Sequence, residues 1–268
     1  MKFGGELLED PSRLRVVVAA IATVAKATPV AIVHGGGKEI DAALKAAGIE
    51  KRQVDGLRIT DEPTLDVVVA VLAGAVNTRL VAALTTAGVP AVGLTGADGG
   101  CGLSDPAPPH RAVDGRMVDL GRVGIPSERA DARLVATLLE GRFVPAVACI
   151  GLGGDGRLYN VNADTFAGHL AARLGARRLV IAGTTAGVLD DSGATMATLE
   201  PAAIERLIHE RTATAGMVAK LNACGHALSH GVGDVVIVDG RDQAALEAAA
   251  LGSPLAKATQ IGHAYNAR

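Results

Sequence analysis

The sequence predicts an α/β protein, a three-layer αβα sandwich built on an open and mostly parallel sheet. Two observations predict this class. Apolar runs of strand length lack polar alternation, as is typical of strands buried on both faces, and they alternate with helical segments that end at glycine. The chain of 268 residues is long enough for one domain, 1–268, with a sizeable core. We expect an N-terminal lobe of about 1–150 and a C-terminal lobe of about 151–268 that share one sheet.

The N-terminal half begins with a short strand at Lys2. Asp10 and Pro11 are typical of a helix N-cap and first turn, and the Asp55-Gly56 pair predicts a tight hairpin. A Gly-, Pro- and Asp-rich stretch at 95–128 predicts short hairpin-like pieces. The other predicted elements are strands at 29–33 and 91–94, a hairpin at 53–58, and helices at 11–27, 38–47 and 63–87.

The C-terminal half repeats the alternation. A glycine-rich hairpin at 153–156 leads to Asn160, Asn162 and Asp164, whose alternation would place three side chains on one strand face. Asp164 then opens a helix. The predicted strands are 144–150, 179–182 and 235–238, and the predicted helices are 131–140, 164–174, 200–209, 217–229 and 243–251.

The composition argues against several classes of partner. Lys and Arg number 26 against 28 Asp and Glu, whereas a nucleic-acid groove or a membrane-surface patch needs clustered basic residues. An apolar content of 49% at a net charge of −2 excludes disorder. With no Trp, two Tyr and three Phe, base-stacking platforms are not expected. We therefore expect no nucleic-acid partner and no membrane.

Cysteine usage and the N-terminal residues indicate a cytoplasmic protein. The three cysteines are far apart and form no CxxC pair, which argues against a disulfide framework and a cysteine zinc site. The N-terminus has no basic-then-apolar signal segment. The uncharged stretch at 80–97 is broken at Gly88 and Pro90, so we interpret it as a helix end followed by a strand.

Glycine-rich turns follow three predicted strands, at 4–5, 35–37 and 183–187. In open α/β sheets, ligands bind beyond the carboxyl ends of strands, where helix N-termini present N–H groups to phosphates. A single glycine turn is usually structural, but three at one sheet edge favour an anion site. Neither GxGxxG nor GxxxxGK[ST] is present, so a dinucleotide site and a P-loop are not predicted.

Four polar residues are candidates for that edge, and each has a structural alternative. Lys2 precedes Gly4-Gly5 and suits either a phosphate or solvent. Lys220 lies in the first turns of a helix, where a lone lysine is usually on the surface. Asp164 suits an N-cap, and Arg58 suits either a fork onto a carboxylate or a solvated position.

Together these residues resemble the motifs of the amino acid kinase family over nearly the whole chain. Seven motifs occur in the family's order and spacing, and VDGLRITD with NVNAD favours the branch that phosphorylates N-acetyl-L-glutamate. The matching pieces are KFGG at 2–5, HGGG at 34–37, VDGLRITD at 54–61, GAVN at 74–77, AVGLTG at 91–96, NVNAD at 160–164 and GMVAK at 216–220.

The resemblance implies transfer of the γ-phosphoryl group of ATP to the side-chain carboxylate of N-acetyl-L-glutamate, a step of arginine biosynthesis. Two anions must meet, so catalysis is mainly positioning and charge neutralisation. Lys2 and Lys220 would stabilise the phosphoryl group, and Asp164 would hold both ammonium groups. Mg²⁺ would arrive on the ATP phosphates, with no dedicated protein metal site and no tightly bound cofactor.

The resemblance also implies two binding surfaces. The substrate would meet the N–H groups of Gly36 and Gly37, the guanidinium of Arg58, and Asn160. The chain departs from the family at Thr184, where relatives usually carry an Asp that helps fix the second lysine, and at Ala258, where they usually carry Gly. The nucleotide would be bound by Gly4, Gly5, Thr184, Gly187, Val188, Leu189, Ala215, Gly216 and Met217.

Two alternative functions share the fold that the resemblance implies. One is a kinase for aminoadipate or glutamate linked to an acidic carrier protein, and such enzymes generally lack the Asp-Gly pair before the arginine. The other is a catalytically silent amino-acid sensor, an alternative that the departure at Thr184 leaves open. A sensor needs none of Lys2, Asp164 and Lys220, so their presence argues against it.

The expected assembly is a homodimer that arginine does not inhibit. In arginine-sensitive relatives, a helix before the first strand joins dimers into a hexamer, whereas here Lys2 of the first strand is the second residue. An apolar stripe on the predicted helix 63–87 suits the dimer contact, although core packing explains it equally well. The stripe consists of Val67, Val68, Val71 and Leu72.

Overall fold

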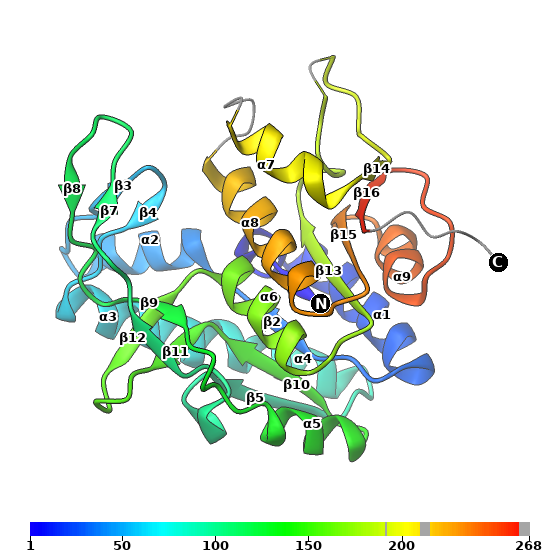
Figure 1. Ribbon diagram of the computed structural model, residues 1–268. Coiled ribbons are helices and arrows are strands. Elements are labelled where there is room, and N and C mark those ends of the chain that lie inside the picture. The colour runs from blue at the N-terminus through cyan, green and yellow to red at the C-terminus, as the bar shows by residue number, and fades with distance from the viewer. Residues whose placement is uncertain (191, 210–214, 263–268) are drawn as a thin grey trace.

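An eight-stranded, mostly parallel sheet forms the centre of the protein (Figure 1). The computed structural model describes residues 1–190, 192–209 and 215–262. Within them the sheet consists of β1 (Lys2–Phe3), β2 (Ile32–His34), β5 (Ala91–Thr95), β10 (Val144–Ala148), β13 (Arg178–Gly183), β14 (Thr198–Leu199), β15 (Asp234–Asp239) and β16 (Ala258–Ile261). The strand order is β14-β16-β15-β13-β1-β2-β10-β5, and only β15 and β16 are antiparallel.

Helices cover both faces of the sheet, so the predicted three-layer α/β class is confirmed (Figure 1). One layer packs α1 (Pro11–Ala27) against α4 (Asn77–Thr86) and α9 (Gln243–Leu251). The other packs α6 (Ala163–Arg173) against α8 (Ala215–Ser229), with α5 (Arg133–Glu140) beside β10. Further helices are α2 (Gly37–Ala46), α7 (Pro201–His209), and the short η1 (Gly5–Leu7) and η3 (Asp98–Gly100).

Local signals set most helix ends where they were expected. Asp10 caps α1 by accepting hydrogen bonds from the N–H groups of Ser12 and Arg13. Gly252, in the left-handed region at φ 79°, ends α9. Strand β1 has sheet neighbours from both halves, β2 on one side and β13 on the other. The division into two lobes stays a prediction.

The polar stretch at 95–128 forms short strands, as predicted. Two of them, β6 (Ser104–Pro106) and β9 (Val123–Pro126), join β11 (Ile150–Leu152) and β12 (Leu158–Val161) in a four-stranded sheet. The hairpin of β7 (His110–Arg111) and β8 (Met117–Val118) lies beside that of β3 (Gln53–Val54) and β4 (Leu57–Arg58), at the left in Figure 1. A 2.8 Å hydrogen bond between His110 Nε2 and Asp55 Oδ2 joins the two hairpins.

Several predicted strand boundaries are wrong for local reasons. The strand expected at 29–33 is β2, which begins only at Ile32, because Pro29 has no N–H to donate to a ladder. The strand expected at 144–150 is divided at Cys149, where the chain leaves the main sheet for the four-stranded one. Strands β14 and β16 were not predicted, because Thr and Gln interrupt the apolar run of β16 and β14 has only two residues.

The helix predicted at 63–87 is a continuous helical run with a π-helical middle. It consists of α3 (Glu62–Val69), the π-helix η2 (Ala70–Val76) and α4. By length and composition Glu62–Thr86 is apolar enough to cross a membrane, yet Leu80 and Leu84 are wholly buried in the core. The core also holds Val68, Val71 and Leu72, so of the two interpretations of the apolar stripe the structure supports core packing.

Candidate active site

Lys2, Asp164 and Lys220 form one buried charged cluster. Lys2 Nζ lies 2.8 Å from Asp164 Oδ1, and Lys220 Nζ lies 3.3 Å from Asp164 Oδ2. Burial by itself raises the pKa of Asp164, but the two ammonium groups outweigh it and hold that pKa below its ordinary value. Asp164 is therefore a carboxylate that holds two cations side by side, with one net positive charge left over.

Asp164 reaches the lysines because another residue caps its helix. Asn162 is the N-cap of α6, and its Oδ1 accepts hydrogen bonds from the N–H groups of Asp164 and Thr165. The predicted arrangement of Asn160, Asn162 and Asp164 on one strand face is wrong, because β12 ends at Val161 and α6 begins at Ala163. The N-cap interpretation of Asp164 is wrong for the same reason.

The glycine turns after β1 and β2 touch each other. A Cβ on Gly5 would lie 2.5 Å from the Cα of Gly36, a backbone contact that leaves room only for glycine. Helix α2 begins directly after this contact, and its N-cap Gly36 offers no side chain to its first N–H groups. An uncapped helix start at the carboxyl end of a parallel strand suits an anion.

His34 and Asn77 support this turn from inside the protein. Asn77 Nδ2 donates to His34 Nε2 at 2.9 Å and to the carbonyl of Ala146 at 2.8 Å. With Nε2 accepting, His34 Nδ1–H points at the carbonyl of Gly35, 3.3 Å away. Burial lowers the pKa of His34 from 6.5 to about 4, so this histidine is neutral.

An open polar cleft of about 630 Å³ lies beside the start of α2, and Gly37, Arg58 and Thr184 line it. Arg58 Nη2 donates to the carbonyl of Gly37 and to Asp41. Its Nη1 is buried and has no hydrogen-bond partner among the described residues. This second nitrogen is suited to a ligand carboxylate.

Asp41 fixes the Arg58 guanidinium. Burial raises the pKa of Asp41, but Lys51 and Arg58 together bring it below the ordinary value, so the carboxylate is charged. Asn160 belongs to a neighbouring network: its Nδ2 donates to Thr60 Oγ1 at 3.2 Å, and Thr60 in turn donates to the carbonyl of Arg58 at 3.2 Å. Asn160 is therefore linked to Arg58 through one hydroxyl.

On the side of β13, Thr259 of β16 holds the predicted nucleotide loop. Its Oγ1 accepts from the N–H of Val188 at 2.8 Å and donates to the carbonyl of Met196 at 2.6 Å. Gly187 is in the left-handed region at φ 140°, where a Cβ would lie 2.4 Å from Thr259 Oγ1. Val188 is buried, whereas Leu189 is half exposed.

The remaining predicted nucleotide residues lie at strand and helix ends. Gly4 and Gly5 follow β1, and Thr184 follows β13, where its carbonyl accepts a 3.1 Å hydrogen bond from Arg241. Ala215, Gly216 and Met217 are the first residues of α8, the helix that carries Lys220.

Four residues of this region were not singled out as site residues from the sequence: Glu6, His34, Asn77 and Thr259. Glu6 lines the cleft and lies near Lys220, since both side chains approach Gly183. A Cβ on Gly183 would lie 3.5 Å from Glu6 Oε1 and 4.0 Å from Lys220 Cε. His34 and Asn77 belong to the HGGG and GAVN motifs, and this membership is the signal by which the sequence could have identified them. Nothing in the sequence marks Glu6, and Thr259 is marked only by its place directly after Ala258, a position where relatives usually carry Gly.

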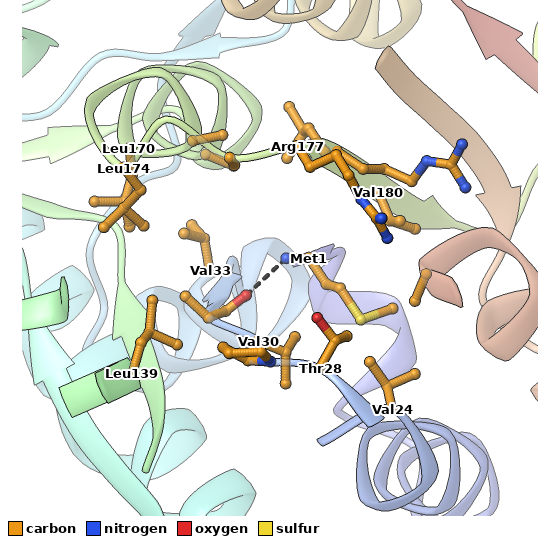
Figure 2. A pocket seen from close by; sticks show the side chains of 18 residues that line it. Met1, Val24, Thr28, Val30, Val33, Leu139, Leu170, Leu174, Arg177 and Val180 are labelled. Carbon is orange, nitrogen blue, oxygen red and sulfur yellow. Dashed lines mark hydrogen bonds between the residues drawn. The ribbon is translucent and has the colours of Figure 1, made fainter. Parts of the chain in front are cut away.

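A second cavity lies at the opposite, amino ends of the central strands (Figure 2). It measures about 220 Å³ and is mainly apolar, with side chains such as Val30, Leu170 and Val180 pointing into it. The amino group of Met1 donates to the carbonyl of Ala31 at 2.7 Å inside it. None of the predicted site residues lines this cavity, so the polar cleft is the candidate site.

Comparisons with known proteins agree with this geometry. Residues 1–239 match the model of the amino acid kinase family. The acetylglutamate kinase of Novosphingobium aromaticivorans is 41% identical over 252 residues, which cover 90% of this chain and 82% of that protein. The acetylglutamate kinase of Methanopyrus kandleri is 42% identical over 243 residues, which cover 89% and 94%.

Solved structures share the fold. N-acetylglutamate synthase from Neisseria gonorrhoeae superposes with a TM-score of 0.80 at 24% identity, over 97% of this chain and 58% of that one. Carbamate kinase from Giardia superposes with a TM-score of 0.69 at 14% identity, over 97% and 96%. With its motifs in register, its sheet order and relatives of about 40% identity, the chain belongs to the amino acid kinase family.

Proposed function

We propose that this protein is an acetylglutamate kinase, which transfers the γ-phosphoryl group of ATP to the side-chain carboxylate of N-acetyl-L-glutamate in arginine biosynthesis. The observation that carries the proposal is the buried carboxylate of Asp164 between the ammonium groups of Lys2 and Lys220, at the carboxyl ends of the sheet strands. The relatives named above, at about 40% identity over 90% of the chain, are acetylglutamate kinases.

The reaction requires no protein base. One oxygen of the substrate carboxylate bonds to the γ-phosphorus, the bond from that phosphorus to the bridging oxygen of ADP breaks, and ADP leaves as an acyl phosphate forms. Both reactants are anions, so the barrier is lowered by cations held in place before the reaction. Lys2 and Lys220 supply these cations, and Asp164 orients both.

The acetylglutamate site comprises Arg58, the start of α2 and Asn160. Nη1 of Arg58, which has no partner within the described part of the chain, receives the α-carboxylate, and the N–H groups at Gly36 and Gly37 receive the carboxylate that is phosphorylated. The nucleotide lies between Gly4-Gly5, the loop at 184–189 and the start of α8. ATP enters as its Mg²⁺ complex, so the metal ion is part of the substrate.

The proposed location is the cytoplasm, and the proposed assembly is a homodimer. Cys101, Cys149 and Cys224 are all free and buried, and burial raises the pKa of each thiol to about 12, as expected of inert reduced thiols. Strand β5 ends the sheet and pairs only with β10 among the described strands. Beside it, Ala70, Gly74 and Ala75 expose a face of small residues that suits close packing of a second copy.

Turnover with a trapped product tests the function. The protein is mixed with Mg-ATP and N-acetyl-L-glutamate, L-glutamate or L-2-aminoadipate, and hydroxylamine converts any acyl phosphate to a coloured hydroxamate. We expect product with N-acetyl-L-glutamate and little with the free amino acids. Turnover of L-glutamate or L-2-aminoadipate without turnover of N-acetyl-L-glutamate would support the first alternative. Binding of N-acetyl-L-glutamate without turnover would support the silent sensor.

A further inference from the structure

A cluster of histidines lies at the end of α8 away from Lys220. His226 and His230 are one helical turn apart near the C-terminus of α8, and their rings stack with centroids 4.1 Å apart. His169 of α6 stacks on the other side of His226, at 5.5 Å. Glu128, from the segment between β9 and α5, faces His230. The proposed reaction uses none of these residues.

The hydrogen bonds of His230 leave a lone pair directed at this space. Its Nδ1 lies 2.8 Å from the carbonyl of His226, which can only accept, so Nδ1 carries the proton. Nε2 of the neutral ring is then an acceptor, and it lies 4.0 Å from Oε1 of Glu128. Two acceptors at this separation do not bond to each other, and a cation between them would satisfy both. A backbone carbonyl that fixes the far ring nitrogen is the usual support of a metal-binding histidine.

Two further ring nitrogens of the cluster are buried. Nε2 of His226 and Nε2 of His169 have no hydrogen-bond partner among the described residues, and His169 as a whole is only 4% exposed. A buried polar atom without a partner costs free energy. Ligand atoms of Glu128, His226 and His230 all lie within 4.8 Å of one another.

We propose that Glu128, His226 and His230 bind a zinc ion, with water in the fourth position. Two imidazoles and one carboxylate are a donor set that Zn²⁺ takes in tetrahedral geometry, whereas Mg²⁺ prefers oxygen ligands. The absence of a CxxC pair argues only against a cysteine site, and the proposed histidine site departs from the sequence-based expectation of no dedicated protein metal site. The ion ties the segment before α5 to α8, the helix that carries Lys220.

Metal titration tests the proposal without reference to kinase activity. Tag-free protein is stripped with a chelator and titrated with Zn²⁺ in competition with a chromophoric chelator. Co²⁺ titration adds a readout of the ligand field through its visible absorption. We expect one Zn²⁺ per chain, an intense tetrahedral Co²⁺ spectrum, and a rise in the unfolding temperature with Zn²⁺ concentration.

Single substitutions identify the ligands. We expect His230→Ala to weaken Zn²⁺ binding by about 100-fold and Glu128→Gln by about tenfold or more, the scale for losing one group of a metal site. Glu128 and His230 are largely exposed at the surface, so both variants should fold, and their unfolding temperatures in chelator should match that of the parent. The control is His110→Ala, which removes a histidine of the β7–β8 hairpin and should keep full affinity.

Three results would contradict the proposal, the third through its ligand set. The first is that the parent protein does not bind Zn²⁺ stoichiometrically and takes it up only as weakly as an ordinary protein surface does. The second is an unchanged affinity in both His230→Ala and Glu128→Gln. A Co²⁺ complex with the weak octahedral spectrum would overturn the tetrahedral His-His-Glu ligand set.

Discussion

Loss of the Asp164 carboxylate would leave the ammonium groups of Lys2 and Lys220 side by side in a buried site with no negative charge between them. We expect Asp164→Asn to lower kcat by about 100-fold or more, the scale for losing one preorganised electrostatic group. KM for N-acetyl-L-glutamate should change much less, because the lysines act on the phosphoryl group in transit. Steady-state kinetics measures both constants. The matched control is Asp131→Asn, an acid beside the exposed Arg133, and equal kcat in the two variants would remove Asp164 from the site.

Arg58 offers the cleft one nitrogen while the other is held by Asp41. Arg58→Lys should raise KM for N-acetyl-L-glutamate strongly and leave KM for ATP near normal, because an ammonium group cannot serve both partners in a fixed plane. Initial rates at varied concentrations of each substrate separate the two effects. Arg52→Lys, at an exposed arginine paired with Asp61, is the control. If KM for ATP rises instead, the two binding surfaces have been assigned the wrong way round.

His34 couples stability to pH. Its pKa is about 4 in the folded protein and ordinarily 6.5, so between these values the unfolded chain binds a proton that the folded protein does not. Stability is therefore lost as the pH falls from 6.5 towards 4, by about 2 kcal/mol at pH 5 for this group alone. His34→Gln keeps an acceptor for Asn77 and should lose that part of the dependence. Urea unfolding at neutral pH and at about pH 5 measures the free energy of unfolding of both proteins. If this free energy falls equally in His34→Gln and in the parent, the loss does not come from His34.

At the scale of elements, the contact between the two glycine turns fixes where α2 starts relative to β1. A methyl group on Gly5 would meet the backbone of Gly36 at 2.5 Å, and backbone atoms cannot rotate away as a side chain can. Gly5→Ala should therefore destabilise the protein by about 1–3 kcal/mol and abolish turnover. Gly154→Ala is the matched control, since the nearest atom to a Cβ there is the side-chain Nη2 of Arg129, 3.6 Å away. Thermal unfolding and the hydroxamate assay report the two effects, and equal melting temperatures would contradict the argument.

The sequence predicted elements whose signals are local and missed those decided by distant partners. Asp10 and Gly252 mark helix ends through their own chemistry, and the Asp55-Gly56 turn forms the expected hairpin. The division of a continuous apolar run at Cys149 depends on a second sheet that the local pattern does not reveal. The same holds for β16, whose Thr259 is buried and bonds to a loop some sixty to seventy residues earlier.

The site likewise contains residues that the sequence predicted and supporting residues that only the structure reveals. Lys2, Asp164 and Lys220 are distant in sequence, but the family motifs predicted that they share one site, and the structure places them in contact. Their internal supports, Asn162 as the cap and His34 with Asn77 under the glycine turn, depend on three-dimensional hydrogen bonds. Periodicity alone placed Asn162 on the wrong element, because a strand end and a helix cap share the same extended backbone.

For the whole molecule, the exposed small-residue face beside β5 carries the prediction about assembly. Ala75→Arg places a long charged side chain on that face and should convert the dimer to a monomer. Light scattering after size-exclusion chromatography measures the mass. Ala244→Arg, at an exposed position of α9, is the control and should stay dimeric. A parent protein that is already monomeric, or a dimer unaffected by Ala75→Arg, would contradict this interface.

The central place of β1 has a consequence for how the chain reaches its native state. Lys2 of β1 is synthesised long before Ile181, its partner in β13, and β15, β16 and β14 extend the sheet only beyond β13. During synthesis the N-terminal half can pair β1 with β2, but the other edge of β1 stays open until β13 emerges from the ribosome. Open strand edges recruit other chains, and such distant pairings form slowly. The time between the synthesis of β2 and of β13 is therefore when this protein is most prone to aggregate.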